Sequence, residues 1–222
     1  MGSITRSFAN NIGSSGILTA SAVTNATVED VTSFDNAASN ATLVLLSTQT
    51  ASNSATISFT TGLDSTYDAY EIKVINAKPA TDDIFLQFNF STDSGSNYNV
   101  TKTTSLFTTY HNEADTDNVF AYNTTNDLAQ STAFQSIGNS TGLGNGADEN
   151  QCVVLQLFNP SSTTYVKHFI VTSQYYSADN YSVNSYIGGY CNTTSAVNAI
   201  QFKMSSGNIS DGIFKLYGVK KS

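Results

Sequence analysis

The sequence predicts an all-β fold, namely an antiparallel, jelly-roll-like β-sandwich preceded by an extended N-terminal arm. Three observations support this prediction. Stretches in which apolar and polar residues alternate recur at regular spacing, about eight to ten of them along the chain. Turn residues separate these stretches, and no stretch has the apolar period of a long helix. No internal repeat of fixed period is visible, which disfavours a propeller or a β-helix.

Residues 1–40 differ from the rest of the chain and are predicted to form a docking arm. Single apolar residues are spaced by small polar ones without a clear period, so the segment buries too little to fold alone. Because these apolar residues are too frequent for a solvated linker, we expect the arm to order against another surface. A plain disordered leader is the alternative. The residues expected to dock are Ile4, Phe8, Ile12, Ile17, Leu18 and Val23.

The folded domain is predicted to span residues 41–222, and its first part contains four strands in a row. Four apolar residues at 43–46 predict an opening strand that is buried on both faces. The later stretches alternate as half-buried strands do, and Ser58 separates Ile57 from Phe59, for example. The four strands are expected at residues 43–46, 55–60, 70–74 and 84–91, with breaks at 62–66 and 79–83.

The second part of the domain contains further strands around a long insertion. Residues 93–97 read as a hairpin loop with a glycine, after which a strand is expected over 98–110. Residues 111–150 look irregular and end in a glycine-rich loop, and surface insertions of this kind often carry recognition. The remaining strands are expected at residues 152–158, 165–173, 199–204 and 213–219.

Composition and charge exclude some classes of function. The formal net charge is −8, and the nine Lys and Arg residues form no cluster apart from Lys220–Lys221. Neither nucleic acid nor an anionic membrane surface is therefore expected as a partner. The N-terminus has no apolar core of signal-peptide length, and no apolar run reaches the roughly 20 residues of a membrane span. We therefore expect the protein to be made and assembled in a cytoplasm.

The cysteines and histidines are expected to be structural. Cys152 and Cys191 lack zinc spacing and are predicted to be reduced, buried thiols, with one disulfide between neighbouring strands as the alternative. His168 follows Lys167, which is expected to be exposed, and is interpreted as a structural histidine in a strand. His111 stands near several acids, but the EF-hand pattern lacks its glycine and its terminal glutamate, so no metal is predicted.

No motif indicates an enzyme, and no cofactor is expected. The acid pairs Asp82–Asp83 and Asp148–Glu149 are adjacent in sequence, so on a strand their side chains point to opposite faces. A nucleophile elbow, a P-loop and a paired-histidine metal motif are all missing from the sequence. The remaining enzymatic hypothesis is a depolymerase that cleaves polysaccharides with carboxylates from distant parts of the chain.

A tyrosine-rich stretch is the best candidate for recognition chemistry. Tyrosine accompanied by Asn and Ser offers rigid contact area together with adaptable hydrogen bonding, which would suit a glycan. Contact between subunits, or ordinary packing within a strand, is the alternative. The candidate glycan contacts are Tyr175, Tyr176, Tyr181, Tyr186 and Tyr190.

Several segments resemble virion structural proteins of tailed phages, of the tail-fibre or capsid-fibre kind found in phages of marine and cyanobacterial hosts. The segments are LLSTQTASNSATISFTTGL, YDAYEIKVINAKPATDD, LQFNFSTDSGSNY and AIQFKMSSGNISDGIFKLYGVKK, with a looser likeness in the opening ITRSFANNI. In such proteins a strand near the start pairs with a closing strand, which here is Ile213 to Val219. Residues 99–190 carry no part of the resemblance.

The resemblance implies a jelly-roll-like domain, often homotrimeric, borne on a fibre, a tail tip or a capsid surface. The partners would be other virion proteins of the tail, portal or capsid, and the arm would be the attachment element. The expected function is therefore that of a virion structural protein, located in the particle and assembled in the host cytoplasm. A host-surface carbohydrate-binding module is the alternative.

Overall fold

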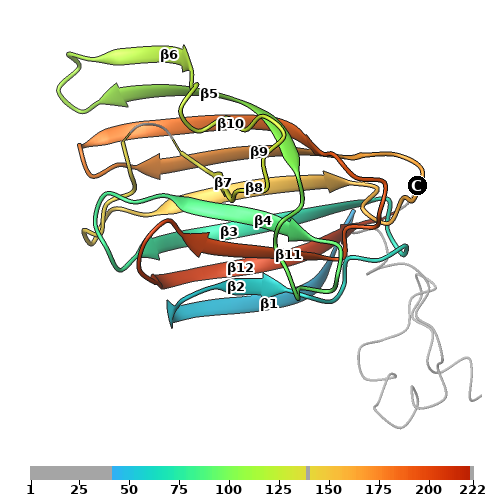
Figure 1. The fold of residues 1–222 in the computed structure, drawn as a ribbon. Helices are drawn as coiled ribbons and strands as arrows, with labels where there is room; N and C mark the ends of the chain where they lie inside the picture. Colours follow the sequence, from blue (N-terminus) through green and yellow to red (C-terminus); the bar gives the residue numbers. More distant parts are fainter. Residues whose placement is uncertain (1–41, 139–140, 221–222) are drawn as a thin grey trace, which may run out of the picture. The chain divides into compact units, whose positions relative to one another are not determined.

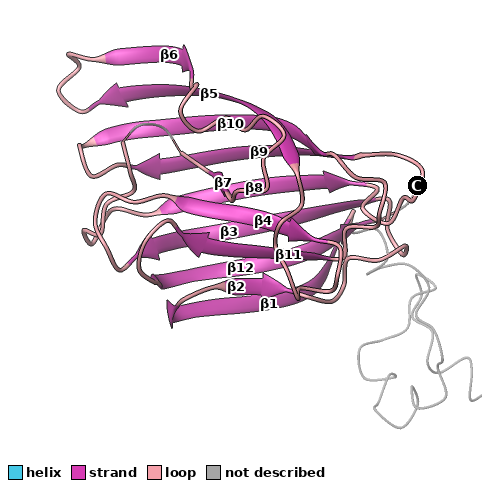
Figure 2. Cartoon of the chain, viewed as in Figure 1, coloured by secondary structure: helices cyan, strands magenta, loops and turns pink. Residues whose placement is uncertain are grey.

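The computed structural model describes residues 42–138 and 141–220, and their regular structure consists of twelve β-strands (Figures 1 and 2). No helix of the described residues is long and apolar enough to cross a membrane. The six residues predicted to dock, from Ile4 to Val23, lie outside the described residues.

The strands form two antiparallel sheets that pack together, as the sequence predicts (Figure 1). The eight-stranded sheet has the order β1 (Leu43–Ser54), β12 (Ile209–Val219), β3 (Ala69–Pro79), β8 (Gln151–Phe158), β9 (Lys167–Tyr176), β10 (Tyr181–Cys191), β5 (Lys102–Asn112) and β6 (Asn118–Tyr122). The four-stranded sheet has the order β2 (Ile57–Phe59), β11 (Ala199–Met204), β4 (Leu86–Ser91) and β7 (Gln135–Ser136).

Eight of these strands have the connectivity of a jelly roll. The row β1-β12-β3-β8 faces the row β2-β11-β4-β7, so that the first strand of the set lies beside the last and the second beside the seventh. The other four strands, β9, β10, β5 and β6, extend the larger sheet beyond β8. The predicted jelly-roll-like sandwich is therefore confirmed, with more strands than the sequence indicates.

The core lies between the sheets and is rich in phenylalanine. Phe88 and Phe90 on β4 both pack against Phe169 on β9, with ring centroids 5.6 and 5.3 Å apart. Phe202 on β11 packs against Phe214 on β12 at 5.4 Å. The rings on β4 and β11 alternate with polar residues along their strands, because successive side chains of a strand point to opposite faces.

The opening strand differs from the prediction. Residues 43–46 lie at the edge of the larger sheet, where β1 pairs only with β12, and Leu45 is 53% exposed. The prediction of burial on both faces is wrong because only one face of the larger sheet packs against the other sheet, so the outward side chain of Leu45 meets solvent. A register shift between Leu45 and Ser47 places an irregularity in the same apolar run.

The insertion at 111–150, predicted to be irregular, contains β6 and β7 and is held by buried polar side chains. Gln135 accepts a hydrogen bond from Thr104 Oγ1 at 2.7 Å and donates one to the carbonyl of Asn126 at 2.7 Å. Gln151 donates to the carbonyl of Ile137 at 2.6 Å. Loop carbonyls that pack against a sheet need such partners, since an unpaired buried carbonyl is costly.

Lys102 is a second anchor for the insertion, and it is fully buried. Its ammonium donates to Asn89 Oδ1 at 2.5 Å and to the carbonyls of Val100 and Ala133, each at 3.0 Å. Asn89 in turn donates to the carbonyls of Tyr98 and Ala133. Lys102 and Asn89 thus supply donors to backbone carbonyls of two segments, residues 98–100 and the insertion at residue 133.

Candidate interaction surface

The most distinctive surface is the outer face of the eight-stranded sheet, meaning the face turned away from the four-stranded sheet. Among the described residues, nine large hydrophobic side chains are exposed, and eight of them lie on this face. The eight are Leu45, Phe107, Phe120, Tyr122, Phe158, Ile170, Tyr186 and Ile213. The ninth, Tyr165, lies in the loop between β8 and β9 and is 70% exposed.

Strand periodicity places these side chains on the outer face. Ile170 stands between Phe169 and Val171, which are both buried in the core, so its own side chain must point the other way. In the same way, Phe107 follows the buried Leu106 on β5. A strand that carries adjacent apolar residues offers apolar groups to both of its faces.

Four of the exposed rings form an aromatic cluster over β10, β5 and β6. The rings of Tyr186 and Phe107 are stacked, with centroids 5.2 Å apart and an interplanar angle of 16°. Phe107 also packs against Phe120 at 5.6 Å, and its register partner on β6 is Tyr122. Phe120 remains 74% exposed. The cluster therefore presents ring faces and edges to solvent near one edge of the sheet.

The outer face of β8, β9, β10, β5 and β6 lacks formal charge. All residues of these five strands are described, and none of their outward-facing positions is Asp, Glu, Lys or Arg. The polar groups there are hydroxyls, amides and the imidazoles of His111 and His168. On the other half of the sheet, Lys73 and Glu71 of β3 lie 3.2 Å apart and pair with each other.

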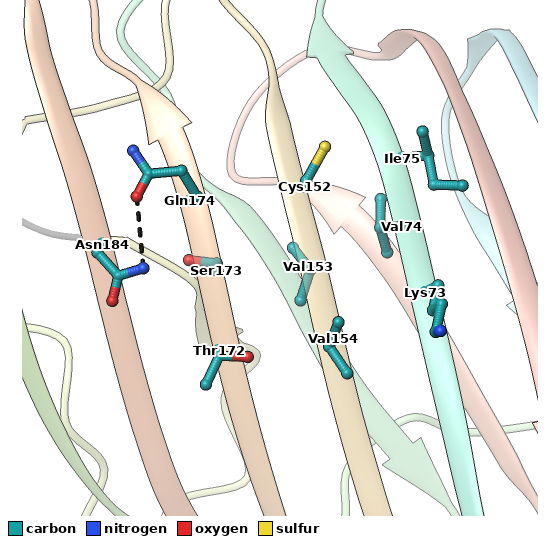
Figure 3. A pocket seen from close by; sticks show the side chains of 10 residues that line it. All are labelled: Lys73, Val74, Ile75, Cys152, Val153, Val154, Thr172, Ser173, Gln174 and Asn184. Carbon is teal, nitrogen blue, oxygen red and sulfur yellow. Dashed lines mark hydrogen bonds between the residues drawn. The ribbon is translucent and has the colours of Figure 1, made fainter.

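A shallow hollow of about 320 Å³ lies on the same face (Figure 3). Its lining includes Lys73, Cys152, Val154, Thr172, Gln174 and Asn184. Asn184 Nδ2 donates to Gln174 Oε1 at 3.3 Å, whereas Asn184 Oδ1 is buried and has no hydrogen-bond partner in the described part of the chain. The hollow adjoins the aromatic cluster, because Thr172 pairs in register with Tyr186, and Tyr186 with Phe107.

The structure divides the five candidate tyrosines between the two faces of the sheet. Tyr176, Tyr186 and Tyr190 point outward, whereas Tyr175 and Tyr181 point inward. Tyr175 is 3% exposed and donates to the carbonyl of Thr141, so its ring belongs to the core. Tyr181 donates to Asp117 Oδ2 at 3.1 Å, and this hydrogen bond raises the pKa of Tyr181. The five tyrosines therefore do not make one surface.

Two further expectations about side chains are corrected. Cys191 is buried as predicted, but Cys152 is exposed, and both thiols are free. Lys167 is fully buried, because it occupies an inward position of β9. Its ammonium reaches the carbonyls of Tyr165 and Thr193 at 3.0 and 3.2 Å, which compensates part of the cost of burial.

The histidines make no metal-binding cluster within the described residues. His111 Nε2 lies 3.0 Å from Asp115 Oδ1, and both side chains are exposed. In the described residues, no three His, Cys, Asp or Glu side chains come together as ligands for a metal ion. His168 is exposed on the outer face, where its ring lies 6.2 Å from that of Tyr190.

Sequence reasoning did not assign Phe107, Phe120 or Ile170 to a site. The sequence does contain a signal for Phe107 and Ile170. Adjacent apolar residues occur at 106–107 and at 169–171, and in a strand they cannot all face one core.

Comparison with known proteins does not assign the chain to a family. No protein-family model matches the chain, and no curated protein gives a significant match to its sequence.

Proposed function

We propose that this protein is a structural component of a phage virion, part of a tail fibre or another particle-attached fibre. In this proposal residues 1–40 dock the chain to other virion proteins of the tail, portal or capsid. The β-sandwich projects from the particle or trimerises, and its role is non-catalytic.

One observation supports this proposal above the others, namely the pairing of the first described strand with the last. β1 and β12 pair antiparallel along their whole length, with Leu45 opposite Tyr217 and Thr50 opposite Ile213. A strand near the start that pairs with a closing strand is the arrangement that the resemblance to virion proteins implies. The uncharged part of the outer face, over β8, β9, β10, β5 and β6, agrees with a role in contacts with other chains.

The test is to locate the protein on assembled particles. We expect imaging of intact particles to find it at a fixed copy number on the tail, portal or capsid. A chain that begins at residue 41 is expected to fold but to be missing from particles, while full-length Tyr165→Ser is incorporated normally. Particles that lack the full-length protein, or that still incorporate the shortened chain, would contradict the proposal.

A second candidate function is recognition of a host-surface carbohydrate. The observation that favours it is the stacked, exposed ring of Tyr186 beside the amides of Gln174 and Asn184, since sugars bind to ring faces and amides. On a glycan array we expect Tyr186→Ala to lose the signal of the full-length protein. Tyr165→Ala, which removes an exposed tyrosine outside the outer face, is expected to keep it.

A further inference from the structure

We infer that the outer face of β8, β9, β10, β5 and β6 is a docking surface for a second copy of this same chain. The inference rests on the proposed structural role and deepens it by naming the partner of this surface. Three properties of the face support it: the distribution of its apolar side chains, its lack of charge and its size.

The apolar side chains extend over the whole surface. Phe158 on β8 marks one side, Ile170 on β9 lies between, and Phe120 on the edge strand β6 marks the other side. Exposed apolar groups gathered on one face mark contacts with proteins, whereas scattered ones need no explanation. One sugar ring would cover only the aromatic cluster and would leave Ile170 and Phe158 in water.

The lack of charge allows a second copy of this acidic chain to dock on this face. Each chain has a formal net charge of −8, so two copies repel each other on approach. Six acids lie in the turns at one end of this face, and they are Glu113, Asp115, Asp117, Asp148, Glu149 and Asp179. Two others border the face and are hydrogen-bonded there, Asp127 by Tyr122 and Glu71 of β3 by Gln156. The outward side chains of the five strands themselves include no carboxylate. Identical copies can therefore meet on these strands without placing carboxylate against carboxylate.

The size of the surface fits a specific contact. Five strands about 4.8 Å apart, each roughly nine residues long at about 3.3 Å per residue, present on the order of 700 Å². A standard interface buries roughly 800 Å² on each partner. The composition also fits, because the cores of interfaces are rich in Tyr and Phe and poor in charged residues. The hollow beside the aromatic cluster offers room for an apolar side chain of the second copy.

The test is the mass of the full-length protein in solution, measured by light scattering and sedimentation over a range of concentrations. We expect a mass of two or more chains of 23.7 kDa. Ile170→Ser and Phe120→Ser are expected to weaken self-association by about tenfold or more, because each removes an exposed apolar anchor. Tyr165→Ser is the matched control, since it removes a ring that is 70% exposed but lies outside the face.

The thiol of Cys152 provides a second readout that does not depend on mass. It is exposed and lines the hollow, while Cys191 is buried. Alkylation of Cys152 is therefore expected to be several-fold slower at concentrations where the chain is associated. Ile170→Ser should restore the fast rate at the same concentration, and circular dichroism of each variant checks that the fold is intact.

Several outcomes would overturn the inference. A wild-type chain that stays monomeric at all concentrations would do so, as would an oligomer that dissociates equally in Tyr165→Ser or not at all in the two face variants. Binding of a saccharide that is lost in the face variants, without any change in mass, would assign the face to a carbohydrate instead. A monomeric chain found on particles contradicts this inference alone, whereas an oligomer never found on particles contradicts the proposed function alone.

Discussion

At the scale of single residues, Lys102 is the side chain on which the insertion most depends. Its three donors meet three oxygens, from Asn89, Val100 and Ala133, in a site without exposure to solvent. We expect Lys102→Met to destabilise the protein by about 2–4 kcal/mol, because three buried oxygens lose a donor. Urea denaturation at pH 7 measures the change. A loss below about 1 kcal/mol would show that the ammonium is dispensable.

Lys102 should also make stability depend on pH. Burial lowers its pKa from 10.5 to about 8 in the folded protein. Between these two values the unfolded chain binds more protons than the folded one, so the contribution of Lys102 to stability rises with pH. Burial raises the pKa of Cys191 from 9.0 to about 12, which acts in the opposite direction above pH 9.

The difference between wild type and Lys102→Met separates the two effects. We expect this difference in unfolding free energy to grow in favour of the wild type as pH rises from 8 to 9.5. Between pH 8 and pH 10.5, the difference in unfolding free energy should grow by about 3 kcal/mol in total. Equilibrium unfolding of both proteins across that range provides the measurement, and a difference that stays constant would contradict the lowered pKa.

The lysines also show where residue-level prediction fails. Alternation along β9, with Phe169 and Val171 inside, places residue 167 on the inner face as well. The preference of lysine for the surface argues against that placement, and the sequence does not reveal that backbone carbonyls of Tyr165 and Thr193 lie within reach. Such partners depend on how segments cross in space, which local patterns do not encode.

At the scale of elements, two adjacent glycines of β10 offer a test of the two faces of the sheet. A Cβ at Gly189 would lie 2.7 Å from both Phe169 Cζ and Thr104 Cγ2 on the core side. A Cβ at Gly188, on the outer face, would meet only Ser105 Oγ, at 3.8 Å. We expect Gly189→Ala to cost about 1–3 kcal/mol and Gly188→Ala to be neutral or slightly stabilising. Thermal unfolding of the pair measures this, and equal effects would contradict the assignment of faces.

Sequence patterns were most informative for elements that pair over long, regular stretches. Ala199–Met204 was predicted with the bounds that the structure has, and the paired ends of the jelly roll follow from clear alternation in residues 42–98 and 199–219. The strands β6, β7 and β10 were missed, and β7, for example, is two residues long and is held by side-chain contacts such as Thr104 to Gln135. The outer face was also missed as a whole, because only the strand order brings Phe158, Ile170 and Phe120 onto one surface.

At the scale of the whole molecule, net charge and the uncharged face together predict how salt affects self-association. Copies that carry a net charge of −8 repel each other over distances that salt shortens, from about 30 Å at 0.01 M to about 10 Å at 0.1 M. Salt would not weaken an ion pair across the proposed contact, because the outward positions of the five strands carry no formal charge.

We therefore expect association of the full-length protein to strengthen several-fold when NaCl is raised from about 0.02 M to about 0.3 M. Sedimentation equilibrium at the two salt concentrations provides the measurement. Ile170→Ser is the control, and it should associate weakly at both concentrations, because its apolar anchor is lost whatever the screening. Association that weakens with salt would instead indicate ion pairs at the contact. It would point to Lys73 and Lys215 meeting the acids of the turns, and so to the charged half of the sheet as the surface between copies.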